Sequence, residues 1–359
     1  MTGPLRICLI ASSRFPVAEP FAGGLEAHTH LLATELIRRG HEVTMFAGPG
    51  SDESLNTRIL NAVPFEASEA ARNDVAAWPV SWMSDHHAYL TLMLELARTG
   101  TRDFDIVHNN SLHHLPIAMA SSIDLPMITT LHTPPVPWLE SAITFAPSDS
   151  VFASVSHATA GAWSATVDST VVYNGVDTER WIAGAGRGPA IWTGRLVREK
   201  GPHLAILAAM ASGIPIDLAG PIGDDAYFED EIRPLIGADV RYLGHLAHHE
   251  LVPIIGRASV AVVTPRWDEP YGLVAAEAMS CGTPVAAFAR GALGELVTPE
   301  AGRLARPDDI ADLARAMIEA STLDRGAVRA HAVRSCSVDT MTDGYEALYR
   351  RMAREAVAA

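Results

Sequence analysis

SVAVVTPRWDEPYGLVAAEAMSCGTPVAAFA, residues 259–289, predicts a complete strand–helix–strand unit. SVAVVTP is a short apolar run typical of a buried strand, and TPVAAFA at 283–289 is another. Between them, good helix formers follow Gly272. Two strands connected by a helix lie parallel in one sheet, so this stretch indicates an α/β fold.

The same alternation runs along the whole chain and begins twice. Strands are expected in the first half at 5–11, 41–48, 105–110, 126–132 and 150–156, and in the second half at 190–194, 214–220, 239–244, 259–265 and 283–289. A Gly-rich stretch at 181–189 separates the halves as a linker, and a helical tail is expected from Asp308 onward. The pattern predicts two doubly wound domains that bind a ligand at the carboxyl ends of their strands.

Composition excludes several classes of protein. With 48% hydrophobic and 19% charged residues, the chain is globular, and its net charge of -15 argues against nucleic acid as a partner. Membrane association is expected to be absent or only peripheral, since no apolar run reaches the length of a spanning helix. The three cysteines are widely spaced, and the first residues do not resemble a signal peptide, so we expect a cytoplasmic protein.

Two glutamates flank the start of the expected helix after Pro265. The backbone N–H groups of Gly272, Leu273 and Val274 would be free there and would favour an anion. Glu269 and Glu277 would repel a bare phosphate, but they suit a phosphate flanked by hydroxyl groups, with a sugar on one side and a ribose on the other. In the alternative, Glu277 faces solvent and Glu269 only complements the helix dipole.

Other candidate residues also follow strands. Arg195 and Lys200 lie in the loop after the strand at 190–194, where two cations beside a helix N-terminus would hold a diphosphate. Gly23-Gly24 would permit close approach of the backbone to a ligand, although a simple turn explains the pair equally well. His132 ends the strand at 126–132 and is expected to face the cleft.

Taken together, six motifs resemble those of the retaining glycosyltransferases of family four, in the same order and over essentially the whole chain. They are Gly23-Gly24, DIVHNN (105–110), TLHTPP (130–135), VVYNGVD (171–177), GRLVREKG (194–201) and EPYGLVAAEAMSCGTPV (269–285). The resemblance implies GT-B architecture, with two Rossmann-like domains that face a central cleft. Residues 1–175 would form the acceptor domain and 176–339 the donor domain, and the last helix, about 340–359, would cross back to the first domain.

The same resemblance assigns roles to residues. Arg195 and Lys200 would bind the diphosphate, Glu277 the ribose and Glu269 the hydroxyls of the donor sugar, while His132 would lie beside the reaction centre. His132, Glu269, Arg195 and Lys200 are thus the expected catalytic residues. The donor site would further include Gly23, Gly24, Gly194, Tyr271, Gly272, Leu273 and Val274. No metal and no cofactor are expected besides the nucleotide sugar, with UDP favoured over GDP.

Several points stay open. Tyr271 replaces a more usual phenylalanine, and its added hydroxyl could change the preference for a sugar. The acceptor is expected near Asn109 and His132. Trp78, Trp82 and Tyr89 could stack on a sugar or simply pack a helix pair. No metal site is expected at D-x-D (103–105), because Asp105 leads straight into a strand. None is expected at the histidines at 113–114 and 245–249, because no acidic or Cys partner is placed to complete a site. A nucleotide-sugar sensor without catalysis and a GT-B epimerase remain alternatives, whereas the lack of G-x-G-x-x-G argues against a dehydrogenase.

Overall fold

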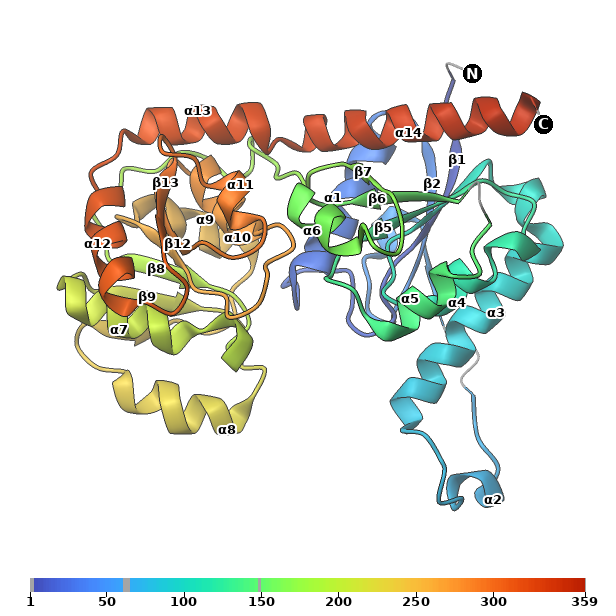
Figure 1. Cartoon of the computed structure of the whole chain (residues 1–359), viewed down its shortest axis with the longest axis horizontal. Coiled ribbons are helices and arrows are strands. Elements are labelled where there is room, and N and C mark those ends of the chain that lie inside the picture. The colour runs from blue at the N-terminus through green and yellow to red at the C-terminus, as the bar shows by residue number, and fades with distance from the viewer. Residues whose placement is uncertain (1–2, 61–64, 148–149, 359) are drawn as a thin grey trace.

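The computed structural model of the chain describes residues 3–60, 65–147 and 150–358. It contains two parallel sheets, each packed against helices, in two lobes that lie side by side (Figure 1). The predicted α/β fold with two doubly wound domains is therefore confirmed.

The first sheet has seven parallel strands in the order β3-β2-β1-β4-β5-β6-β7. The strands are β1 Arg6–Ile10, β2 Glu42–Ala47, β3 Thr57–Ile59, β4 Ile106–Asn109, β5 Met127–Leu131, β6 Val151–Ser154 and β7 Thr170–Val171. The helices around them are α1 Gly24–Arg38, α2 Glu69–Arg72, α3 Val80–Asp103, α4 His114–Ala118, α5 Pro137–Ile143 and α6 His157–Trp163. The order reverses between β1 and β4, which is where such sheets open a crevice for ligands.

The second sheet has six parallel strands in the order β10-β9-β8-β11-β12-β13. The strands are β8 Ala190–Thr193, β9 Ile216–Ala219, β10 Val240–Tyr242, β11 Ala261–Val263, β12 Val285–Phe288 and β13 Gly302–Ala305. The helices are α7 Pro202–Ser212, α8 Asp225–Tyr227, α9 His248–Arg257, α10 Leu273–Ser280, α11 Leu293–Leu296, α12 Ile310–Ala320, α13 Arg325–Ser335 and α14 Val338–Ala358. Here the order reverses between β8 and β11.

Strand β1 shows why its sequence is apolar throughout. Ile7 and Leu9 pack into one core, while Cys8 and Ile10 pack into a different core on the opposite face of the sheet. A parallel sheet covered by helices on both faces needs apolar residues at every position, not at alternate ones. Cys8, Cys281 and Cys336 are all buried and free, so cysteine here is a small core residue.

Helix α14 crosses from the second lobe to the first, as predicted. Figure 1 shows α13 and α14 end to end along one side of both lobes. The hydroxyl of Tyr349 lies 2.6 Å from Nδ1 of the buried His108, and Arg39, directly after α1, forms an ion pair with Asp343 at 2.6 Å. The chain also passes between the lobes at Val176, whose backbone bridges to Ser337.

Asp105 of the D-x-D sequence has a structural role, since its carboxylate pairs with Arg6 at 2.7 Å and also accepts a hydrogen bond from the Arg6 backbone. Across the part of the chain that the structure describes, no helix combines the length and the apolar character needed to cross a bilayer.

Candidate active site

The ends of the parallel strands form a cleft of about 380 Å³ between the two domains. Residues after β5 and before α1 line it on one side, and the loops after β8, β9 and β11 line it on the other. The predicted residues that line it are Gly23, Gly24, His132, Gly194, Arg195, Lys200, Glu269, Tyr271, Gly272, Leu273, Val274 and Glu277.

Lys200 is positioned by the loop that follows β8. The hydroxyl of Thr264, just after β11, donates to the backbone oxygens of Lys200 and Gly201 at 3.1 and 2.9 Å. Gly201 has φ of 64°, and a Cβ there would collide with the backbone oxygen of Thr264, so only glycine fits. These contacts hold the loop with Lys200 against the loop that carries Glu269.

Glu269 is therefore adjacent to a cation. Its Oε2 accepts hydrogen bonds from Lys200 Nζ at 2.7 Å and from the indole N–H of Trp267 at 3.1 Å. The same ammonium group lies 5.0 Å from the centre of the Trp267 ring. Lys200, Glu269 and Trp267 thus form one compact group at the wall of the cleft.

Helix α10 begins at Leu273, after Gly272 with φ of 100°, as the sequence predicted. Gly272 supplies no side-chain cap, and its carbonyl accepts from the N–H groups of Ala275 and Ala276. Within the described chain, the N–H groups of Gly272, Leu273 and Val274 have no hydrogen-bond partner. Because these groups line the cleft at the positive end of a helix, they suit a phosphate.

Glu277 lies one turn inside α10 and is 9% exposed, so it does not face open solvent. Burial raises the pKa of its carboxyl group to about 8, and the charge of Arg180 opposes this only in part. A buried carboxyl group without a bonded partner in the described structure can accept hydrogen bonds from a ligand hydroxyl. The surface-helix alternative for Glu277 is therefore wrong.

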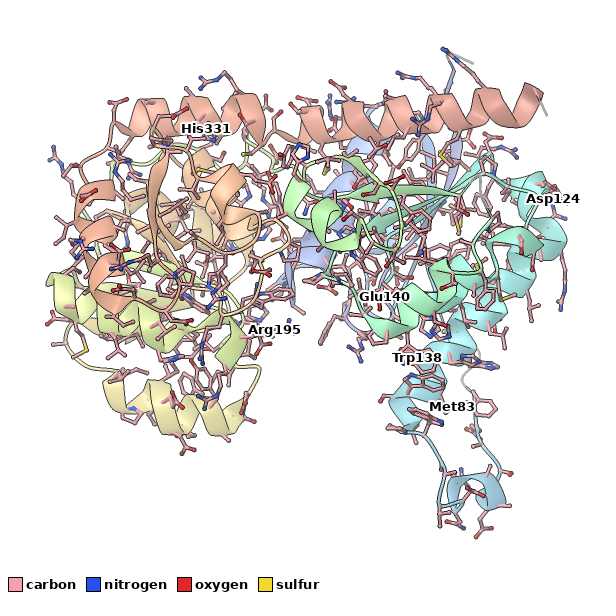
Figure 2. The ribbon with its side chains drawn as sticks, viewed as in Figure 1. Met83, Asp124, Trp138, Glu140, Arg195 and His331 are labelled. Atoms are coloured by element: carbon pink, nitrogen blue, oxygen red, sulfur yellow. The ribbon has the colours of Figure 1, made fainter. Side chains whose placement is uncertain are left out.

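Arg195 is an exposed cation on the cleft wall, next to Gly194. Figure 2 shows it at the side of the second domain that faces the first. Its guanidinium group has no ion-pair or hydrogen-bond partner among the described residues, unlike Arg198 nearby, which pairs with Glu231 at 2.6 Å. Arg195 is thus available for an anionic ligand.

The Gly-Gly pair brings the first domain close to α10. A Cβ at Gly24 would lie only 3.1 Å from the side chain of Leu273, so glycine allows the start of α1 to approach the start of α10. Glu26, two residues later, also lines the cleft and is 5% exposed. Burial raises its pKa, while Arg195 across the cleft opposes the shift. Sequence reasoning missed Glu26, although its place after Gly-Gly was a usable signal.

His132 follows β5 directly and lines the cleft. Its Nε2 lies 2.9 Å from Oδ1 of Asn110, and its ring packs edge-on to buried His28 with centroids 4.9 Å apart. Burial and the neighbouring His28 and His108 hold the pKa of His132 well below its usual value, so the imidazole is neutral. Because Asn110 Oδ1 only accepts, Nε2 carries the proton and Nδ1 is left as an acceptor.

Asn109, which was predicted at the acceptor site, is not brought to the cleft. It is fully buried, donates to Thr129 at 3.3 Å and accepts from the backbone N–H and the hydroxyl of Ser111. Asn110, one residue later, lies next to His132 instead. The prediction was displaced by one position because Asn109 is still part of β4.

The idea that the Tyr271 hydroxyl changes the preference for a sugar is not supported. Tyr271 is 3% exposed, and its ring belongs to a core that also contains Cys336. The hydroxyl oxygen is itself buried, and this burial, with Cys336 and Tyr173 nearby, holds the pKa of the phenol well above its usual value. Asn174, in contrast, lines the cleft with a buried carbonyl oxygen that has no partner in the described structure, and sequence reasoning gave it no role.

The histidines at 245–249 and at 113–114 lie in different places. Nε2 of His245 donates to the backbone oxygen of Phe21 at 3.1 Å, and His245, like His248, lines the cleft. In the described part of the chain, the cluster of possible metal ligands consists of His86, His113 and His114, outside the cleft lining. Nδ1 of His113 is occupied, since it accepts the N–H of Leu115 at the start of α4.

Known proteins resemble the chain in both halves. Residues 22–180 match the family model of Glycosyltransferase Family 4, and residues 186–332 match that of Glycosyl transferases group 1. A Mycobacterium tuberculosis protein (strain H37Rv) named glycogen synthase is 32% identical over 87% of this chain and 85% of its own length. A D-inositol 3-phosphate glycosyltransferase of Mycolicibacterium paratuberculosis is 27% identical over 98% of this chain and 91% of its own length.

Among solved structures, the Anabaena protein Alr3699/HepE in complex with UDP and glucose superposes with a TM-score of 0.74 at 18% identity, covering 96% of this chain and 99% of that one. This likeness supports the two-domain fold described above. Together with the family matches over both halves, it leads to one conclusion: the chain belongs to the GT-B glycosyltransferases that combine a Glycosyltransferase Family 4 region with a Glycosyl transferases group 1 region.

Proposed function

We propose that the chain is a retaining glycosyltransferase that moves a sugar from a nucleoside-diphosphate sugar, UDP-linked in preference to GDP-linked, to a hydroxyl of an acceptor. One observation carries the proposal: Arg195, Lys200 and the free N–H groups at the start of α10 line one cleft together with the carboxyl groups of Glu269 and Glu277. The two cations and the N–H groups would bind a diphosphate, and the two carboxyl groups would bind the ribose and the sugar that flank it.

In this proposal the second domain stabilises the leaving group. Arg195, Lys200 and the N–H groups of Leu273 and Val274 bind the diphosphate, and their attraction to it grows as the bond to the anomeric carbon breaks. Glu277 accepts hydrogen bonds from the ribose. Glu269, held by Lys200 and Trp267, accepts from hydroxyls of the donor sugar.

Retention of configuration follows from attack on the face that the diphosphate leaves. The anomeric C–O bond to phosphate breaks, the acceptor oxygen bonds to the anomeric carbon on the same face, and the leaving phosphate oxygen takes the acceptor proton. Glu269 is engaged in an ion pair and Glu277 is buried in α10, so neither is proposed as a covalent nucleophile. His132, neutral, would accept a hydrogen bond from the donor sugar through Nδ1.

Metal independence and a cytoplasmic location are further parts of the proposal. Two protein cations and a helix N-terminus supply the positive charge that a diphosphate needs. Three cysteines that are all free and buried suit a reducing compartment. The relative named glycogen synthase and the Anabaena protein complexed with UDP and glucose support a UDP-sugar donor and a carbohydrate acceptor.

A thermal-shift panel with UDP, GDP, ADP and dTDP, each with and without EDTA, tests the proposal. A diphosphate at about 100 times its Kd should stabilise the protein by roughly 2.7 kcal/mol, also with EDTA present. Product analysis by proton NMR should then show that the donor's anomeric configuration is kept. Binding without transfer to any acceptor would favour a nucleotide-sugar sensor, and activity that needs added manganese would contradict metal independence.

A further inference from the structure

Aromatic side chains of the first domain form a connected row outside the cleft. It consists of Trp78, Trp82, His86, His114 and Trp138, here called the aromatic row. Ring centroids are 4.9 Å apart for Trp78 and Trp82, 5.4 Å for Trp82 and His86, 6.1 Å for Trp82 and Trp138, and 5.1 Å for Trp138 and His114. The row joins three separate segments, namely the start of α3, the start of α4 and α5.

The two outer tryptophans expose much of their surface. Trp78 is 57% exposed and Trp138 is 53% exposed, although indole is normally among the more buried side chains. Tyr89, which the sequence placed with the tryptophans, behaves differently: it is 2% exposed, and its hydroxyl donates to the backbone oxygen of Ala11. Tyr89 packs the helix, whereas Trp78 and Trp138 leave indole faces open to a ligand.

Two members of the aromatic row follow segments that line the cleft. His114 lies two residues beyond Leu112, and Trp138 lies five residues beyond Thr133; Leu112 and Thr133 both line the cleft. Figure 2 shows Trp138 on the first domain close to Met83 of α3, and Figure 1 shows α2 and the first turns of α3 projecting from the body as an arm. The row therefore extends from segments that border the cleft to the base of the arm.

Charge limits what this surface can bind. Residues 65–90 contain four carboxylates, at Glu66, Glu69, Asp74 and Asp85, against the one arginine Arg72. Such a surface repels phosphorylated ligands and anionic lipid head groups. A neutral ligand with flat apolar faces and hydroxyl groups matches these properties.

We propose that the aromatic row is an extended acceptor subsite for a neutral oligosaccharide. The C–H faces of successive sugar rings stack on the exposed indoles of Trp138 and Trp78, and the chain end that receives the new sugar lies in the cleft. This inference rests on the proposed glycosyltransferase function and deepens it, because it names the acceptor as a chain of several uncharged sugars and not a small phosphorylated molecule.

Binding of maltose and maltoheptaose tests the proposal, since these neutral glucans differ only in length. Tryptophan fluorescence and calorimetry on the full chain, with and without UDP, should give a Kd at least tenfold lower for maltoheptaose. Trp78→Ala and Trp138→Ala should each weaken maltoheptaose about five- to tenfold and maltose less than twofold. Trp78→Phe should keep most of the binding. Met210→Ala, which truncates a 60%-exposed side chain on the second domain, is the matched control and should change nothing.

Equal affinity of the native chain for both glucans, or unchanged maltoheptaose binding in both alanine variants, would overturn the subsite. So would flotation of the native chain with phosphatidylcholine–phosphatidylglycerol vesicles that Trp78→Ala abolishes, because the row would then be a membrane contact. The UDP thermal shift, measured on the same variants, keeps the two proposals apart. If UDP gives no thermal shift in the native chain, this counts against the donor site. Glucan binding measured without UDP still tests the aromatic row.

Discussion

Lys200 Nζ lies 2.7 Å from Glu269 Oε2 and joins two loops that follow different strands of the second domain. The side chains are 27% and 13% exposed, so the pair is partly shielded from solvent at the wall of the cleft. A diphosphate entering the cleft would compete with Glu269 for the ammonium group. The pair therefore keeps Lys200 in place before the ligand arrives.

Lys200→Ala should weaken UDP binding about 10- to 100-fold, because a charge-assisted hydrogen bond contributes roughly 1.5–3 kcal/mol. Uridine lacks the phosphates, so its affinity should change less than about threefold. Calorimetric titration of both ligands measures the difference. Arg198→Ala is the matched control, since Arg198 is a nearby cation that pairs with Glu231 and does not line the cleft. An equal loss for uridine and UDP would remove Lys200 from the phosphate site.

Glu269→Gln should lower kcat at least about 100-fold and leave the UDP Kd within about threefold, since the lost interaction acts on the donor sugar during transfer. Glutamine keeps the size of the side chain and can still accept from Trp267, so the fold should be preserved. Steady-state kinetics and UDP titration on the same preparation give both numbers. If kcat and UDP affinity fall together, Glu269 is a structural partner of Lys200 and not a donor-sugar ligand.

The sequence predicted which residues of the second domain line the cleft, because their placement depends on chain order. Arg195, Lys200 and the start of α10 follow parallel strands of one sheet, and the carboxyl ends of such strands meet at one edge. No contact between distant parts of the chain is needed to bring them together. The crossing of the last helix, in contrast, came from the family resemblance alone.

The errors concern the direction of side chains. Asn109 and Asn110 are adjacent, yet only Asn110 reaches His132, because β4 ends between them. Tyr271 turns its hydroxyl toward Cys336, a contact that forms only when α13 packs on α10. Glu26 comes from the other domain, so its presence beside Arg195 depends on how the two domains meet. These side-chain directions and contacts depend on tertiary packing, so they cannot be predicted from a local sequence pattern.

Nucleotide affinity should depend on pH through Glu277. The pKa of this carboxyl group is raised to about 8 by burial, so it is mostly protonated at pH 6 in the free protein. Ribose hydroxyls that donate to it favour the carboxylate, so UDP binding would release a proton and the Kd should fall as pH rises from 6 to 8, by at most about tenfold per pH unit. Calorimetry in buffers of different ionisation enthalpy would count the proton.

Glu277→Gln is the control for this pH dependence and should give weak UDP binding with a flatter pH profile. The same pKa shift also affects folding stability. A carboxyl group whose folded pKa lies above its unfolded value destabilises the fold as pH rises from about 4.5 to 8. The glutamine variant should therefore melt at a higher temperature than the native chain at pH 8. A pH-independent UDP Kd in the native chain would show that Glu277 does not ionise on binding.

Gly24→Ala should impair transfer without unfolding the protein. The added Cβ would meet the Leu273 side chain at 3.1 Å, where α1 of the first domain approaches α10 of the second domain. Because this contact is tighter than packing normally allows, the two helix starts should move apart, and we expect kcat to fall about tenfold while the melting temperature changes by only a few degrees. Gly161→Ala in α6, where a Cβ meets nothing within 4 Å, should keep full activity. Full activity in Gly24→Ala as well would mean that transfer does not require the close approach of the two helices.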